Sequence, residues 1–318
     1  MHDIINPTYR HEPGARYRQL LEATRELEPI STAVVHPCDR LSLEGALEAR
    51  QHGLITPLLV GPEARIRQTA RDATLDITDL EIVDTPHSHA AAARAVAMVR
   101  EGRASALMKG AIHTDEVMAA VVDRNLGLRT ERRMSHVFAL DVPHYPKPLF
   151  ITDAAINIYP DLAMKRDIVQ NAIDLAHALG IERPLVAILS AVETVDGKIA
   201  STIDAAALCK MAERGQITGG ELEGPLAFDN AISPEAAKAK HIDSSVAGHA
   251  DVLVAPDLEA ANMLAKQLIY LAESQSAGIV LGARVPIMLT SRADDVLSRL
   301  ASAALAQLYV HHHMRSDP

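Results

Sequence analysis

Short β-rich runs alternate with longer segments of helical periodicity almost from one end of the chain to the other. Parallel strands joined by crossover helices produce this alternation, because each connection must return across the sheet. Strands are expected at residues 32–36, 57–60, 81–84, 104–108, 136–142, 149–152, 185–190, 251–255, 278–282 and 286–290. The apolar spacing predicts helices at residues 161–179, stopped by Gly180, and from 296 onward. The sequence therefore predicts an α/β fold with mainly parallel sheets.

The chain of 318 residues is long enough for two subdomains. Proline and glycine cluster at residues 141–148 and 282–286, and we interpret these clusters as crossings between two lobes. Residues 1–145 and 280–318 would form lobe one, and residues 146–279 would form an inserted lobe two. Ligands of open α/β sheets favour the carboxyl ends of strands, so we expect a site in a cleft between the lobes.

Composition excludes several classes of partner. A net charge of -10 and an aromatic content of 3% argue against nucleic acid, which needs positive charge and stacking surfaces. No apolar run approaches the roughly 18 to 20 residues that span a bilayer. The first residues contain no apolar signal-peptide core, and Cys38 and Cys209 lie far apart. A soluble cytoplasmic protein without membrane association is expected.

Metal-ligand spacing is also missing from the sequence. The chain has no HExxH motif, no paired CxxC motifs and no dense carboxylate array. The run His311–His313 adjoins the carboxyl end, where a frayed tail is the simpler interpretation. The sequence therefore predicts no metal site.

The segment PIMLTSRADD, residues 286–295, passes from a predicted strand into a predicted helix. Ser291 and Asp294 have the spacing of a helix capping box, and carboxylates suit the positive end of a helix. Alternatively, Ser291 and Arg292 face a substrate at the carboxyl end of the strand. Both interpretations remain open on these residues.

The run ALMKGAIHTDEV leads from a strand through Lys109 and Gly110 to His113 and Thr114 at the start of a helix. A glycine that permits close backbone approach, free N–H groups at a helix amino end and a lysine charge together suit a phosphate or a carboxylate. An ordinary βα turn capped by Thr114 fits equally well.

The run GLRTERRMSH places Arg129, Arg133 and Ser135 just before a strand. Guanidinium groups bind phosphate through two parallel hydrogen bonds. The run is therefore a candidate anion site, and the alternative is a solvated basic turn.

Polar residues also follow strands or interrupt apolar helix faces in the middle of the chain. Buried amides and carboxylates need hydrogen-bond partners, so these residues either satisfy loop backbone or face a polar ligand. The candidates are Asp153, Asn157, Asn171 and Glu193.

Read together, these runs resemble the phosphate acetyltransferase and phosphate butyryltransferase family. The resemblance covers about Leu27 to Leu308 and is closest to butyryl-type members and to the acyltransferase half of fusions with enoyl-CoA hydratase. It rests on the collinear runs LMKGAIHTDE, GLRTERRMSHVF, LFITDAAINIYPDL, DIVQNAIDLA, VAILSAVETV, TIDAAALCKMAERGQI, GPLAFDNAIS, VLVAPDLEAANMLAKQL and VPIMLTSRADD.

The resemblance implies a two-lobed fold like that of isocitrate and isopropylmalate dehydrogenases, and a homodimer. It implies reversible transfer of an acetyl or short-chain acyl group between coenzyme A and phosphate, with both substrates meeting in the cleft and no tightly bound cofactor. Two anionic substrates must be held together, and Lys109, Arg129, Arg133 and Arg292 are the candidate cations.

The resemblance also implies roles at the strand-to-helix junction. Ser291 would hydrogen-bond at the reacting centre without forming an acyl-enzyme, and Arg292 would steady the phosphoryl group. Acetyl-type members carry a catalytic aspartate seven residues after the serine, a position that Ser298 occupies here. Asp294 is the candidate base in its place, although its capping role explains it equally well.

Three alternatives accompany this hypothesis. The enzyme could prefer butyryl groups, because a few apolar side chains set the acyl pocket. A non-catalytic module that senses acyl-CoA would also carry these motifs. A dehydrogenase of the same fold is disfavoured, because the chain has no clear nicotinamide fingerprint and no aspartate cluster for a divalent metal.

Overall fold

A computed structural model describes residues 10–289 and 296–316, and the chain divides into two compact units. Unit 1 comprises Met1–Arg16 and Met134–Ser276, and unit 2 comprises Tyr17–Arg133 and Ala277–Pro318. The boundaries between the units, after Arg133 and after Ser276, lie before the predicted crossings near residues 145 and 280. The amino-terminal residues up to Arg16 belong to unit 1. The predicted cleft between lobes stays a prediction.

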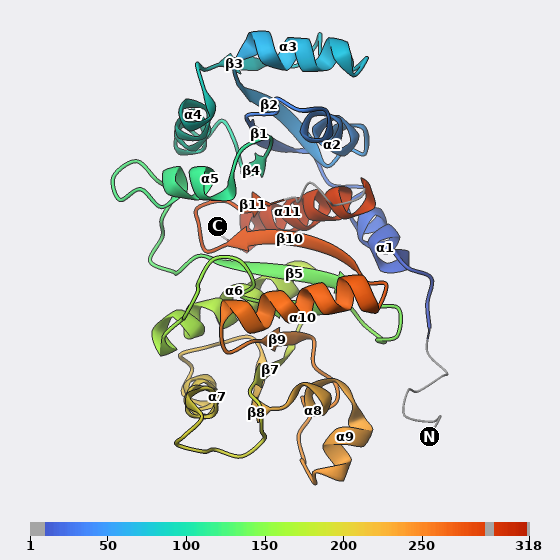
Figure 1. The fold of residues 1–318 in the computed structure, drawn as a ribbon, viewed down its shortest axis with the longest axis vertical. Helices are drawn as coiled ribbons and strands as arrows, with labels where there is room; N and C mark the ends of the chain where they lie inside the picture. The colour runs from blue at the N-terminus through green and yellow to red at the C-terminus, as the bar shows by residue number, and fades with distance from the viewer. Residues whose placement is uncertain (1–9, 290–295, 317–318) are drawn as a thin grey trace. The chain divides into compact units, whose positions relative to one another are not determined.

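The sheet of unit 2 has the strand order β3-β2-β1-β4-β11-β10 (Figure 1). Its pairs are parallel except for β10 and β11. The strands are β1 (Ile30–Val35), β2 (Ile55–Gly61), β3 (Ile82–Asp84), β4 (Ala106–Lys109), β10 (Gln275–Leu281), which begins in unit 1, and β11 (Ile287–Met288). The helices are α1 (Ala15–Ala23), which crosses the unit boundary, α2 (Arg40–Gln51), α3 (Glu63–Asp72), α4 (Ser88–Arg100), α5 (Thr114–Val121) and α11 (Val296–Ser316). Five of the six residues of β1 are buried, as expected for a parallel strand covered on both faces.

Helix α11 is more deeply buried than its sequence pattern predicts. The apolar spacing predicts one buried stripe, but every residue from Ala301 to Gln307 is buried. The alanines in this stretch allow neighbouring elements to pack closely on several sides, and α11 packs against α2 and β11. The Gln307 side chain donates hydrogen bonds to the carbonyl groups of Leu27, Glu28 and Gly53, which satisfies its buried amide nitrogen.

The sheet of unit 1 has the strand order β5-β6-β9-β7-β8, with β5 antiparallel to β6 and the other pairs parallel. The strands are β5 (Ser135–Asp141), β6 (Leu149–Thr152), β7 (Leu185–Leu189), β8 (Glu221–Leu226) and β9 (Val252–Val254). The helices are α6 (Leu162–Ala178), α7 (Ala200–Glu213), α8 (Phe228–Ile232), α9 (Pro234–Ala239) and α10 (Leu258–Leu271). Figure 1 shows α10 in front of the strands of this unit.

Two predictions about the elements of unit 1 have clear outcomes. Helix α6 lies within the predicted range and is followed by Gly180 with a φ of 83°, a backbone conformation that favours glycine. Strand β8, with the sequence ELEGPL, is absent from the predicted strands because glutamates, a glycine and a proline interrupt its apolar pattern. Both units confirm the α/β class with mainly parallel strands.

The amino-terminal residues of unit 1 are held by a buried carboxylate. Asp141, at the end of β5, is 1% exposed and contacts the His11 ring nitrogen Nε2, the Arg16 guanidinium and the Arg16 backbone N–H. Arg16 also donates to the Tyr145 carbonyl over 2.7 Å. These contacts explain why residues 10–16 group with unit 1.

None of the helices described in residues 10–289 and 296–316 has the length and apolar character that a membrane span requires.

Candidate functional site

Strand register in unit 2 brings two of the predicted motifs to one edge of a sheet. Strand β11 is parallel to β4, with Ile287 beside Leu107 and Met288 beside Met108. Lys109 is the next residue of β4, and it pairs with Val35 of β1. The carboxyl ends of β1, β4 and β11 therefore share the sheet edge that α/β proteins use for ligands.

The three predicted catalytic residues follow β11 in the sequence. Ser291, Arg292 and Asp294 lie outside the described residues. Their roles stay predictions, and so does the choice between a helix cap and a substrate contact. Ser298, which stands seven residues after Ser291, is buried near the start of α11.

Strand β4 ends at Lys109, and the next residue, Gly110, packs closely against the backbone of Val35 and His36. The Gly110 N–H donates to the Val35 carbonyl over 2.9 Å, and the Ala111 N–H donates to the His36 carbonyl over 2.9 Å. A Cβ atom at position 110 would lie 2.5 Å from the Val35 carbonyl oxygen and 2.8 Å from that of His36. The close approach that Gly110 permits is therefore to the chain's own backbone. Lys109 is half-buried beside it.

Helix α5 begins directly after this crossing. His113 is its N-cap residue, without a side-chain capping bond, and Thr114 is its first helical residue. The first turn also carries Asp115 and Glu116. Glu116 accepts a hydrogen bond from the Ser88 hydroxyl over 2.7 Å, which holds the pKa of this carboxyl below its usual range. These carboxylates already complement the positive end of α5 and would oppose an anionic ligand there.

The arginine-rich loop before β5 is joined to the turn between β10 and β11. Arg129 forms an isolated bridge with Ala283, and the Arg284 N–H donates to the Leu128 carbonyl over 2.9 Å. The Thr130 hydroxyl donates to the Gly282 carbonyl over 2.7 Å. Arg129 is exposed on this anchored loop, and Arg133 is exposed at the end of the first segment of unit 2.

In unit 1, Asp153 organises the loop that follows β6. Its carboxylate accepts hydrogen bonds from the backbone N–H groups of His136, Ala155, Ile156 and Asn157, and from the Asn157 side-chain amide over 2.6 Å. The Asn157 amide also donates to the Met134 carbonyl. Burial raises the pKa of Asp153, while these donors oppose the shift. The described contacts of Asp153 and Asn157 satisfy loop backbone, one of the two alternatives left open by the sequence.

Ser135 and Asn171 form a second buried pair in unit 1. The Asn171 side-chain amide donates to the Ser135 hydroxyl over 2.8 Å, and both residues are fully buried. The bond links α6 to the first residue of β5. Both residues are predicted site residues, but the sequence gives no reason to pair them, because they stand in separate elements.

Glu193 lies apart from this group, on the loop after β7. Its carboxylate accepts a hydrogen bond from the Lys240 ammonium over 2.9 Å, and this bond lowers the pKa of Glu193. The described partner of Glu193 is thus Lys240, which stands 47 residues away in the sequence.

His136 is a deeply buried titratable group next to the predicted residues Ser135 and Asp153. Its ring is 2% exposed and packs edge-on against Phe138, with ring centroids 4.4 Å apart. Burial lowers its pKa to about 4, so the ring is neutral at pH 7. In the sequence, His136 is the last residue of the run GLRTERRMSH, and neither its burial nor its packing can be read from the run itself.

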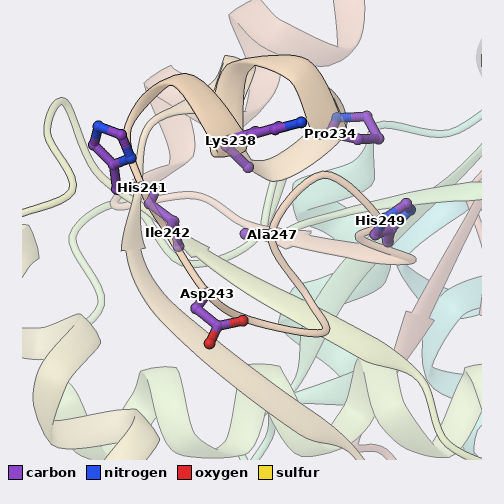
Figure 2. A pocket seen from close by; sticks show the side chains of 8 residues that line it. Pro234, Lys238, His241, Ile242, Asp243, Ala247 and His249 are labelled. Carbon is purple, nitrogen blue, oxygen red and sulfur yellow. The ribbon is translucent and has the colours of Figure 1, made fainter.

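Unit 1 also has an open surface pocket of about 320 Å³ beside α9. Figure 2 shows His241 and His249 on opposite sides of it, with Lys238 extending along the helix toward Pro234. None of the predicted site residues lines this pocket, and its charged side chains do not converge on one point. Over residues 10–289 and 296–316, no group of three or more His, Cys, Asp or Glu side chains is placed to hold a metal ion.

The amino-acid sequence of this chain is similar to those of known phosphate acyltransferases. The chain is 65% identical to a phosphate acetyltransferase of Rhizobium meliloti over 295 residues, which cover 93% of each chain. It is 41% identical to a phosphate butyryltransferase of Clostridium beijerinckii over 292 residues, 92% of this chain and 97% of the relative. Both relatives therefore align over almost their whole length.

A solved structure and a family model support the same assignment. The crystal structure of a branched-chain phosphotransacylase from Enterococcus faecalis V583 matches with a TM-score of 0.77 and 28% identity, covering 89% of this chain and all of the other. This match confirms the predicted fold class. The family model described as phosphate acetyl/butaryl transferase matches residues 88–307, which include the β4, arginine-loop and β11 segments. The chain belongs to the phosphate acetyl/butaryl transferase family.

Proposed function

We propose that the chain is a phosphate acetyltransferase, which transfers an acetyl group reversibly between coenzyme A and inorganic phosphate. The observation that carries the proposal is the 65% identity to a phosphate acetyltransferase over 93% of both chains, compared with 41% to a phosphate butyryltransferase. The sequence resemblance favoured butyryl-type members, so butyryl-CoA is the second candidate substrate. Acetyl-CoA and phosphate enter as substrates in one direction, acetyl phosphate and coenzyme A enter in the other, and no tightly bound cofactor is required.

The proposed reaction exchanges one bond for another without a net redox change. A phosphate oxygen attacks the thioester carbon of acetyl-CoA, the carbon–oxygen bond forms, and the carbon–sulfur bond breaks. The leaving thiolate takes up a proton to give the free thiol of coenzyme A. In the opposite direction this thiol, with a reference pKa of about 8.5, must lose its proton before it attacks acetyl phosphate.

The sheet edge formed by β1, β4 and β11 supports a site for this reaction. Lys109 stands at this edge, and the Ser291–Arg292 pair follows β11 by a few residues. In the proposed site, Lys109, Arg129, Arg133 and Arg292 attract the two anionic substrates, and Ser291 hydrogen-bonds to the reacting group. Asp294 is the proposed base, a role worth roughly 10²-fold to 10⁴-fold in rate.

The test is a thiol-release assay with the pure protein. Acetyl-, propionyl- and butyryl-CoA are each incubated with phosphate, and free coenzyme A is followed with a thiol reagent. We expect phosphate-dependent release with the highest kcat/KM for acetyl-CoA. Higher kcat/KM with butyryl-CoA would reassign the acyl group, and binding of acyl-CoA by calorimetry without any turnover would replace the enzyme with an acyl-CoA sensor.

Two variants test the proposed catalytic pair. Ser291→Ala is expected to lower kcat by roughly 10²-fold to 10³-fold, as loss of one hydrogen-bond donor to a reacting oxygen does in other acyl transfers. Arg292→Gln should lower kcat and raise the KM for phosphate. Arg67→Gln, on the exposed surface of α3, is the matched control and should retain full activity. Wild-type kcat in Ser291→Ala would remove this residue from the mechanism.

We also propose that the protein works as a cytoplasmic homodimer.

A further inference from the structure

His36 directly follows strand β1 at the sheet edge that carries Lys109. Its N–H donates to the Val60 carbonyl over 2.7 Å, and its carbonyl accepts hydrogen bonds from the N–H groups of Cys38 and Ala111. Lys109 pairs with Val35, the residue before His36. The backbone of His36 is therefore held between β2 and the turn after β4, at the edge that α/β proteins use for ligands.

The backbone of His36 has a conformation that few side chains adopt. Its φ is 55°, in the left-handed region. Among the other described residues, Thr74, His241 and Glu273 also have a positive φ without being glycine, and all three are exposed, whereas His36 is only 5% exposed. Glycine would adopt this conformation without strain. A buried histidine held in it beside a ligand edge points to a role for the imidazole ring.

One hydrogen bond fixes how the two ring nitrogens of His36 are used. Nδ1 lies 2.9 Å from the Ala111 carbonyl oxygen. A carbonyl oxygen only accepts, so Nδ1 carries the hydrogen, and in the neutral ring Nε2 is left with a lone pair. Nε2 has no hydrogen-bond partner in the described part of the chain, and it is not fully enclosed by protein atoms, unlike Nδ1 of His136. Nε2 is thus an accessible acceptor at this edge.

An acceptor gives an anion site a selectivity that a cation alone lacks. The Lys109 ammonium would attract phosphate and sulfate alike, because it acts as a point charge on any anion. Hydrogen phosphate has a P–OH group that donates a hydrogen bond, whereas sulfate at neutral pH has only acceptor oxygens. A nitrogen lone pair that faces sulfate would stay unpaired against an anionic oxygen, which weakens binding.

From these observations we infer that Nε2 of His36 accepts a hydrogen bond from the P–OH group of inorganic phosphate and thereby selects protonated oxyanions over sulfate. The inference rests on the proposed function and adds a specificity residue to its phosphate site. It also fits the proton balance of the proposed reaction. Hydrogen phosphate brings the proton that ends on the thiol of coenzyme A, so an acceptor for the P–OH proton suits the place where phosphate binds.

Anion binding to the pure protein tests the inference without any turnover. Calorimetry gives the Kd of phosphate, arsenate and sulfate for the wild type and for His36→Asn. Asparagine tolerates a positive φ, and its amide can still donate to the Ala111 carbonyl, but it has no atom in the place of Nε2. We expect the Kd of phosphate, and of arsenate, which also carries a hydroxyl proton, to rise about 10-fold, while the Kd of sulfate stays within about 2-fold of wild type.

Two further variants make this measurement specific. His241→Asn is the matched control, because His241 has a φ of 56° and is exposed in unit 1. It should leave all three Kd values unchanged. Thermal unfolding establishes that each variant is folded. If His36→Asn does not fold, His36→Gly takes its place with the same expectation, because glycine adopts the positive φ without strain.

A titration with coenzyme A distinguishes inorganic phosphate from the phosphate groups of the nucleotide. The Kd of coenzyme A should be the same for the wild type and for His36→Asn, since the inferred contact is made to inorganic phosphate. A change confined to coenzyme A would overturn the inference.

The remaining outcomes separate the inference from the proposed reaction. A wild type that does not prefer phosphate to sulfate, an unchanged phosphate Kd in His36→Asn, or equal weakening of phosphate and sulfate would each overturn the role of His36. Thiol release from acetyl-CoA would stand in all three cases. A wild type that selects phosphate through His36 but releases no thiol refutes the proposed reaction and leaves the phosphate contact standing.

Discussion

Gly110 lies in a motif that suggests ligand binding, but in the folded chain it allows two backbone segments to pack closely. The sequence LMKGAIHT suggests a glycine that lets a phosphate approach the backbone. In the folded chain, the space beside Gly110 is occupied by the carbonyl groups of Val35 and His36. This contact joins the ends of β1 and β4, so the residue helps to build the sheet edge at which Lys109 stands.

Gly110→Ala should lower the free energy of unfolding by about 1 to 3 kcal/mol, since backbone atoms cannot give way to the added methyl group as a flexible side chain would. Chemical denaturation measures the change. Gly197→Ala is the matched control, because a Cβ atom there would meet nothing within 4 Å. An unchanged unfolding free energy combined with a raised KM for phosphate would instead favour the ligand-binding interpretation.

Asp153 and Asn157 show what sequence can and cannot establish for single residues. The sequence predicts that these side chains either satisfy loop backbone or face a polar ligand, because buried polar groups are almost always hydrogen-bonded. Which partners they have depends on the fold, since His136 and Met134 approach them from another part of the chain.

Among the elements, α6 and β5 are connected by a polar contact inside an otherwise apolar region. Asn171 of α6 is followed by Ala172 and Ile173, which are fully buried, and its amide donates to the Ser135 hydroxyl. A buried hydroxyl and amide that satisfy each other fix the position of the helix relative to the strand more specifically than apolar packing does.

A double-mutant cycle tests this connection between α6 and β5. Asn171→Ala should cost about 1 to 3 kcal/mol of unfolding free energy, because the Ser135 hydroxyl loses its donor in a buried site. Ser135→Ala should cost less once Asn171 is already absent, with a coupling of about 1 kcal/mol between the two positions. Urea denaturation of the four proteins provides the values, and strictly additive losses would show that the bond contributes nothing.

Elements with regular patterns were the most predictable. Helix α6 and its glycine stop follow directly from the 3.6-residue apolar spacing, and the buried parallel strands follow from short apolar runs. Strand β8 and the depth of α11 were not predictable. Strand β8 has an irregular sequence and is a strand because it pairs with β7. The burial of α11 depends on the elements that pack around it, which its own sequence does not specify.

At the scale of the whole molecule, the stability of the folded chain is expected to depend on pH through His136. Its pKa is lowered to about 4 by burial, whereas histidine in an unfolded chain has a pKa of about 6.5. Between these values the unfolded state binds a proton that the folded state does not. Stability is therefore full above pH 6.5 and falls as the pH drops toward 4, by up to about 3 kcal/mol from this residue.

His136→Gln should flatten this part of the stability profile, because glutamine does not titrate. The measurement is the unfolding free energy of both proteins at pH 7, 6 and 5. His249→Gln, which changes an exposed histidine, should leave the wild-type slope intact. Identical slopes for His136→Gln and the wild type would exclude His136 as the group responsible.

The sequence alone determined the α/β class and the family, because strand and helix periodicities and a series of collinear motifs are local properties of the chain. It also identified the β4 and β11 segments as candidate parts of one site. The tertiary structure decided that β4 and β11 pair in parallel, that Gly110 packs against backbone, and that Ser135 bonds to Asn171. These relations join residues far apart in the sequence, so they depend on strand order, register and burial, which arise only when the whole chain packs.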